Sequence, residues 1–74
     1  MDKKEAFYLI KFGDLLRKHR RSQKISQQQL GFETGLTRES INRIENGKIN
    51  ISLLNIIKIA KALSIPPKDL FDIE

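Results

Sequence analysis

Residues 25–47 read ISQQQLGFETGLTRESINRIENG, and they are the part of the sequence most informative about the fold. Ser26, followed three residues later by Gln29, is the capping-box pattern with which many helices begin. Gly35 is suited to the left-handed conformation in which helices often end. Only about three residues, 35–37, then lead to the next helical segment, so two short helices must cross at a tight turn.

The second of these helices is predicted over Arg38–Glu45, with Thr37 as its cap and Asn46–Gly47 as its stop. At about 100° per residue, Ile41 and Ile44 lie together on one side of this helix. Four long or polar side chains spread across the opposite side: Arg38, Glu39, Asn42 and Arg43.

This polar side has the chemistry to read base edges in DNA. Asparagine pairs with adenine, arginine pairs with guanine, and glutamate can accept a hydrogen bond from cytosine. A polar outer face is also what any solvated helix has, and Glu39 and Arg43 could simply pair with each other. The tight turn and the basic charge of the chain favour base reading.

The net charge of +5 is concentrated in the first two thirds of the chain. Residues 1–48 hold eleven Lys/Arg and six Asp/Glu, whereas residues 49–74 hold three of each. One end of the domain is therefore expected to offer a positive field to a polyanion. A charge of this size could also serve solubility alone.

Length and composition argue against several other classes of protein. A chain of 74 residues forms one domain with a thin core, which makes a deep catalytic cleft improbable. It has no cysteine for disulfides or thiolate zinc sites, and His19 has no second ligand or base beside it in the sequence. No stretch approaches the ~20 apolar residues of a membrane span. We expect a soluble cytoplasmic protein that is not an enzyme and uses no metal, cofactor or small-molecule effector.

Apolar residues at three- and four-residue steps predict helices in the rest of the chain as well. These helices are expected from about Ala6 or Ile10 to Ser22, from Leu53 (capped by Ser52) to about Leu63, and from Pro67 to Phe71. On the first helix, Arg17, Lys18 and Arg21 are left for solvent, and His19 packs near the edge of the core. The helix from Leu53 to about Leu63 is apolar around most of its circumference and should lie in the middle of the bundle. The predicted fold is all-α, a compact bundle of five helices.

The segment Ile25–Leu30, together with Gly35, Ile41, Ile44 and Glu45–Gly47, resembles the phage-repressor (Cro/cI, or XRE) helix-turn-helix family. The likeness continues upstream to Arg20 and downstream to Leu54, Ile59–Ala60, Leu63 and Leu70–Phe71, so that it covers about residues 10–73. It implies a five-helix DNA-binding domain over residues 10–74. Residues 1–9 precede it, and we expect them to prolong the first helix over the core, with a contact between subunits as the alternative.

The resemblance also implies roles for single residues. Base-reading positions are Arg38, Glu39, Asn42 and Arg43; phosphate-binding positions are Gln27, Thr37, Asn46, Lys48 and Asn50. Arg20 and Glu45 match a family ion pair between the first and third helices. Two positions depart from the family pattern, because Gly31 stands where alanine is usual and Ser64 where glycine is frequent.

The leading functional hypothesis is a transcription regulator, such as a phage repressor or a restriction–modification controller, that binds double-stranded DNA. Members of the family often dimerise through their C-terminal helices, which implies a homodimer on a palindromic operator. The apolar residues available for that interface are Ile65, Leu70, Phe71 and Ile73. Two alternatives stay open: an antitoxin that binds a protein toxin and autoregulates its operon, and a scaffold or RNA-associated module without base readout.

Overall fold

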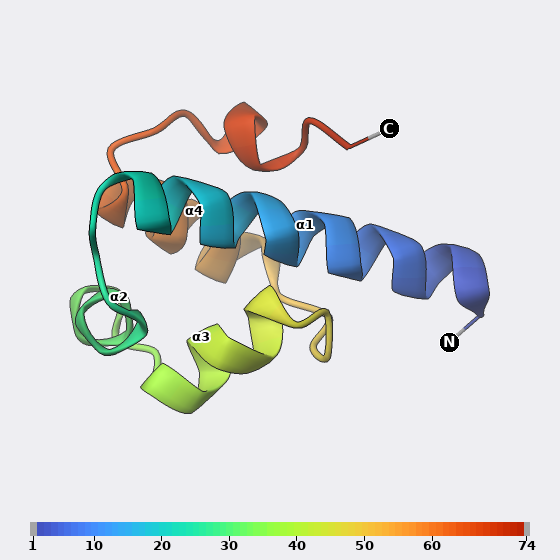
Figure 1. Ribbon diagram of the computed structural model, residues 1–74, viewed down its shortest axis with the longest axis horizontal. Coiled ribbons are helices and arrows are strands. Elements are labelled where there is room, and N and C mark those ends of the chain that lie inside the picture. Colours follow the sequence, from blue (N-terminus) through green and yellow to red (C-terminus); the bar gives the residue numbers. More distant parts are fainter. Residues whose placement is uncertain (1, 74) are drawn as a thin grey trace.

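The computed structural model describes residues 2–73 as four α-helices and one short 3₁₀ helix (Figure 1). The elements are α1 (Lys3–Ser22), α2 (Gln27–Thr34), α3 (Arg38–Glu45), α4 (Leu53–Ala62) and the 3₁₀ helix η1 (Pro67–Leu70). The described residues include no strand, as predicted for an all-α fold. None of their helices is both long enough and apolar enough to cross a membrane.

The prediction of five α-helices is wrong for the last element. Its backbone bonds span three residues, with Asp69 N–H donating to the Pro66 carbonyl (3.0 Å) and Phe71 N–H donating to the Lys68 carbonyl (3.0 Å). The four residues of η1 begin at Pro67 and follow Pro66, and they are too few to propagate the longer bonds of an α-helix, so the tighter 3₁₀ turn forms instead.

The first helix begins at Lys3, so that residues 3–9 prolong it beyond Ala6 and Ile10. Asp2 Oδ1 accepts from the backbone N–H of Glu5 (2.8 Å), and Glu5 Oε1 accepts from that of Asp2 (3.1 Å), which completes a capping box. The end of α1 therefore projects beyond the rest of the bundle (Figure 1). The segment was expected to lie over the core. Phe7, Tyr8 and Ile10 are instead exposed on it.

The helix-turn-helix of α2 and α3 has the predicted bounds. Ser26 Oγ accepts from the Gln29 N–H (3.0 Å), and Thr37 Oγ1 accepts from the Ser40 N–H (3.0 Å). The capping box at α2 is only half formed, because the Gln29 amide donates to Glu33 (3.0 Å) rather than back to the cap. Gly35 ends α2 in the left-handed conformation, with φ of 77°.

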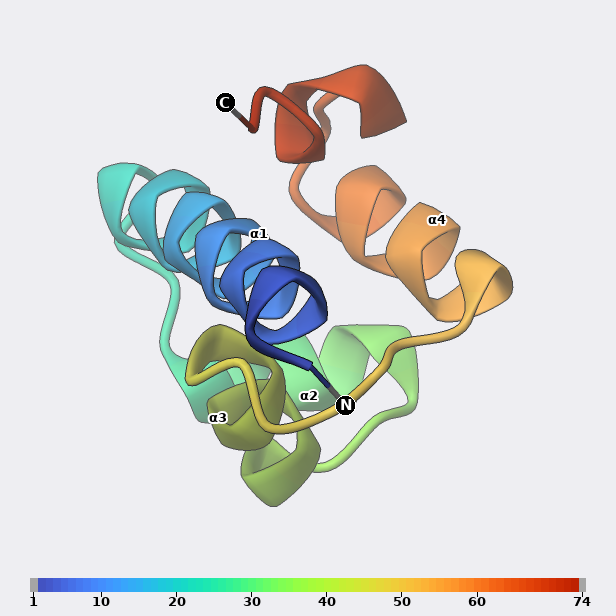
Figure 2. The ribbon, with the colours of Figure 1, turned by 90° about the vertical axis from the view of Figure 1, so that its right-hand side faces the viewer.

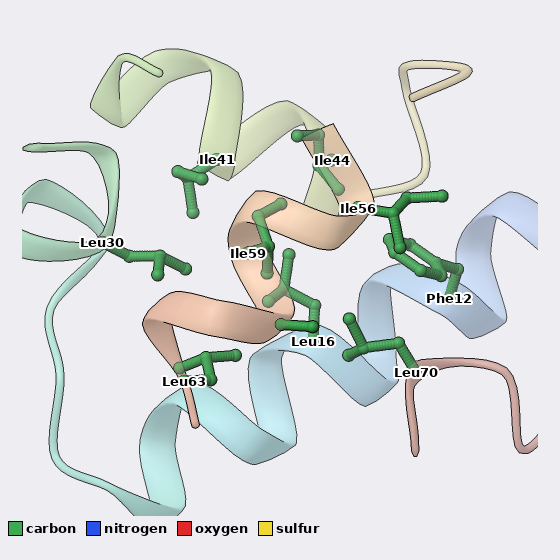
Figure 3. Packing of buried hydrophobic residues seen from close by; sticks show 10 residues of the cluster. Phe12, Leu16, Leu30, Ile41, Ile44, Ile56, Ile59, Leu63 and Leu70 are labelled. Carbon is green, nitrogen blue, oxygen red and sulfur yellow. The ribbon is translucent and has the colours of Figure 1, made fainter. Parts of the chain in front are cut away.

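The core is a single cluster to which every helix contributes (Figure 3). Its members are Phe12, Leu16, Leu30, Ile41, Ile44, Ile56, Ile59, Ala60, Leu63 and Leu70. Burial of α4 is one-sided, contrary to the prediction for a central helix. Leu53 and Leu54 are 68% and 69% exposed, because the first turn of α4 lies at the rim of the bundle (Figure 2).

The C-terminal apolar residues are divided between core and surface. Leu70 is fully buried and therefore cannot belong to a subunit interface as predicted, while Ile65 and Ile73 pack partly buried against the core. Phe71 is half exposed and packs its ring against Phe12, with centroids 5.7 Å apart. Ser64 adopts the left-handed conformation (φ 55°) that glycine would adopt without strain.

Candidate nucleic-acid interface

The third helix lies on the outside of the molecule, on the side opposite the C-terminal segment (Figures 1 and 2). Ile41 and Ile44 anchor its inner side in the core. The four side chains predicted to read bases, Arg38, Glu39, Asn42 and Arg43, are all exposed on its outer side. Together with Gln27 of α2 they line a shallow hollow of about 280 Å³. The outer side of α3 is thus polar and uncovered, as entry into a major groove requires.

The Arg20–Glu45 ion pair holds α3 against α1 from inside. Arg20 Nε donates to Glu45 Oε2 (2.6 Å) and Arg20 Nη2 donates to Glu45 Oε1 (3.0 Å). Arg20 Nη1 also donates to the carbonyl of Ile25, just before α2 (2.8 Å). The two residues are only 7% and 1% exposed. This bidentate, water-excluded pair fixes the position of α3 relative to the helices behind it.

Glu45 stays ionised in this environment. Burial raises the pKa of its carboxyl group, but hydrogen bonds from Arg20 and Gln27 and the charges of Arg20 and Arg17 outweigh burial and leave the pKa below its ordinary value. The carboxylate can therefore only accept hydrogen bonds.

Arg17 belongs to this site, although it was predicted to face solvent. Arg17 Nη2 donates to the Glu45 carbonyl (3.0 Å) and to Asn46 Oδ1 (3.1 Å), and its Nε lies 3.4 Å from Glu45 Oε1. The sequence held a signal for this contact. Arg17 precedes Arg20 by three residues, so both side chains leave the same side of α1 and can reach one carboxylate.

The residues predicted to bind phosphate occupy separate places. Gln27 and Thr37 stand at the amino-terminal ends of α2 and α3, where backbone N–H groups favour anions. Asn46 caps the other end of α3, and Lys48 is exposed in the loop beyond it. Asn50 instead lines a second hollow, with Glu5, Tyr8 and Leu9 of α1.

His19 is half-buried at the edge of the bundle, in a hollow shared with residues of η1 and its flanks. Among residues 2–73, no group of three or more His, Asp or Glu side chains is placed to hold a metal ion. The polar chemistry of the described residues is concentrated around Glu45 and the outer side of α3.

The sequence profile of the helix-turn-helix family matches residues 16–70. The chain belongs to the helix-turn-helix family. It is 50% identical over 62 residues to the control protein C.BamHI of Bacillus amyloliquefaciens, covering 82% of this chain and 76% of that protein. It is 42% identical to the control protein C.MunI of a Mycoplasma species, covering 88% and 90% of the two chains.

A solved structure supports the same assignment. The restriction-modification controller protein C.AhdI from Aeromonas hydrophila superposes with a TM-score of 0.84 at 46% identity, over 85% of this chain and 96% of that one. These three relatives are regulatory proteins by name. This helix-turn-helix protein is accordingly a DNA-binding regulator of transcription.

Proposed function

We propose that this protein recognises an operator through α3 and thereby controls the transcription of restriction–modification genes. The observation that carries the proposal is the outer side of α3, where four exposed side chains with base-reading chemistry share one hollow. The named roles of the similar proteins C.BamHI and C.AhdI, a control protein and a restriction-modification controller, point to the genes under control.

Within this proposal, Arg38, Glu39, Asn42 and Arg43 contact base edges. Gln27, Thr37, Asn46, Lys48 and Asn50 hold the DNA backbone on either side. The division follows the general rule that phosphate contacts position a protein on the duplex and base contacts specify the sequence. Residues 10–74 form the DNA-binding unit, and the projecting first turns of α1 are an addition to it.

The test is selection of bound duplexes from a random pool, followed by affinity measurements across salt concentrations. A consensus sequence that the protein prefers over a scrambled duplex is expected. Equal affinity for every duplex, with only a steep dependence on salt, would reduce the protein to a nonspecific binder.

The regulated genes can be found by recovering fragments of the source genome with the purified protein. We expect enriched fragments to lie upstream of genes for a DNA methyltransferase and an endonuclease. Enrichment only at unrelated promoters would leave a transcription regulator but remove the restriction–modification role.

We also propose that the protein acts as a homodimer on a palindromic operator, with half-sites about one helical turn apart, roughly 34 Å. Because Leu70 is part of the core, the predicted interface residues that remain for pairing are the half-exposed Phe71 and the partly buried Ile65 and Ile73.

A further inference from the structure

A chain of side-chain hydrogen bonds runs along α3 near its carboxyl-terminal end. It starts at Arg17, passes through three amide side chains, and ends at the carboxylate of Glu45. The successive bonds are Arg17 Nη2 to Asn46 Oδ1 (3.1 Å), Asn46 Nδ2 to Asn42 Oδ1 (3.3 Å), Asn42 Nδ2 to Gln27 Oε1 (3.4 Å) and Gln27 Nε2 to Glu45 Oε1 (3.0 Å). Because Arg17 also lies against Glu45, this chain of hydrogen bonds closes into a ring.

The two charged members determine the direction of every bond in the ring. A guanidinium can only donate, so Asn46 must turn its oxygen toward Arg17 and its nitrogen toward Asn42, whose backbone carbonyl also accepts from that nitrogen (2.8 Å). A carboxylate can only accept, so Gln27 must turn its nitrogen toward Glu45 and its oxygen toward Asn42. Asn42 lies between an amide nitrogen and an amide oxygen, and only one orientation of its own amide satisfies both.

The buried end of the ring is held firmly. Glu45 is bound bidentately by Arg20, and the side chain of Glu45 is fully buried. The exposed end is Asn42, which lines the hollow on the outer side of α3. An orientation imposed by buried charges is thereby passed to a side chain that faces the solvent.

We infer that Gln27 and Asn46 are positioning residues that fix the amide orientation of Asn42 and so determine the base preference at the pair it contacts, an inference that rests on the proposed function. With one N–H and one oxygen lone pair engaged in the ring, Asn42 keeps one of each for the DNA. That remaining pair matches the N7 acceptor and N6 donor of adenine, and rotating the amide by 180° would exchange the two. The ring holds this orientation before DNA arrives.

Gln27 can serve the ring and the DNA backbone at once, because its nitrogen carries two hydrogens. The two roles differ in what they do to binding. Loss of a phosphate contact weakens binding to all duplexes alike, whereas loss of the amide orientation changes preference at one base pair.

The principal variant is Gln27→Met, which keeps the length of the side chain and removes its amide. Its affinity is measured for the wild-type consensus duplex and for duplexes changed at each position in turn. We expect selectivity at the pair contacted by Asn42, identified with Asn42→Ala, to fall about tenfold. Selectivity at the other positions should stay as in the wild type.

A second variant, Asn46→Asp, replaces the donor next to Asn42 by an acceptor while keeping a partner for Arg17. Asn42 then lies between two acceptors, the new carboxylate and Gln27 Oε1, so that no orientation of its amide satisfies both, and we expect its preference for one base to be lost. This readout also guards against a misfolded Gln27 variant, and thermal melting of both proteins checks the fold.

Lys48→Met is the matched control. It also replaces a long polar side chain by methionine, but in the loop after α3, outside the ring. It should weaken binding to every duplex equally. In the Asn42→Ala background, Gln27→Met should produce no further change in selectivity. If wild-type protein selects a consensus but Gln27→Met loses the same factor on all duplexes, the positioning role is overturned and the proposed function stands. If wild-type protein selects no consensus, the proposed function itself is overturned.

Discussion

At the scale of single residues, Arg20 and Arg43 have different roles, because the first stabilises the fold and the second lies on the outer side of α3. Arg20 is buried and bidentate to Glu45, whereas the Arg43 side chain is 63% exposed and lies 4.0 Å from Glu39. Arg20→Ala leaves a buried carboxylate without its main partner, and we expect a loss of about 3–5 kcal/mol in unfolding free energy. A domain of this size holds only roughly 5–10 kcal/mol in total. Arg43→Ala should leave stability within about 0.5 kcal/mol and weaken DNA binding. Urea denaturation of both variants measures these changes. Equal losses of unfolding free energy would contradict the different roles given to Arg20 and Arg43.

Glu45 should also make the fold sensitive to acid. Its pKa is lowered in the folded protein relative to the ordinary value of 4.5. The stabilisation from this group is therefore present above about pH 4.5 and is lost as the pH falls from there through the folded-state pKa. Urea denaturation between pH 7 and pH 3 should show this loss. Glu45→Gln should flatten the profile, whereas Glu39→Gln, an exposed change on the same helix, should retain it. An unchanged profile for Glu45→Gln would refute the assignment.

At the scale of elements, α1 crosses the end of α3 at close range, with Gly13 at the crossing. A Cβ atom at Gly13 would lie 2.5 Å from the carbonyl oxygens of both Ile44 and Glu45, which belong to the backbone and cannot rotate away. Gly13→Ala is expected to force α1 away from α3 and to lower the unfolding free energy by about 1–3 kcal/mol. Lys18→Ala, on the exposed side of the same helix, is the control and should change stability little. Melting curves that coincide for the two variants would show that α1 can shift without cost.

The helix-turn-helix was predictable because the boundaries of its helices depend on capping residues that act locally. Ser26, Gly35 and Thr37 act on the backbone within three residues of themselves, and α2 and α3 have the predicted bounds. The exact first residue of α1 was not predicted, although Asp2 and Glu5 carried the same kind of signal. The exposure of the first turn of α4 could not be predicted, because it depends on how far the neighbouring elements reach.

The candidate site was only partly predictable for the same reason. The exposed side of α3 follows from helical periodicity, since Ile41 and Ile44 fix which side faces inward. The hydrogen-bonded ring joins Gln27 of α2 to Asn42 of α3 and to Asn46, which caps α3. It closes through Arg17 of α1. Spacing along the sequence says nothing about such an arrangement. It appears only once the ion pair of Arg20 has brought α1 and α3 together.

At the scale of the whole molecule, two kinds of surface lie far apart. The polar side of α3 and the C-terminal segment are on opposite sides of the bundle (Figures 1 and 2). Substitutions in the C-terminal segment can therefore be used to disturb pairing of subunits without touching the side chains proposed to contact bases. The exposed apolar residues Leu53 and Leu54 at the start of α4 offer one competing surface.

Phe71→Ser tests the proposed pairing surface directly. Phe71 is 50% exposed, and burying the exposed half of this side chain against a second subunit would contribute about 0.75–1.5 kcal/mol. A two-fold interface loses two rings at once, so the dimer dissociation constant should rise by roughly one to two orders of magnitude. Analytical ultracentrifugation over a range of protein concentrations measures this change, and thermal melting checks the loss of packing on Phe12. Operator affinity should fall with the dimer, while binding to an isolated half-site should stay constant because α3 is untouched.

Leu54→Ser is the control and should leave the dimer intact. If Leu54→Ser dissociates it instead, the subunits pair through the start of α4, and a wild-type protein that stays monomeric at all concentrations would exclude pairing through either surface.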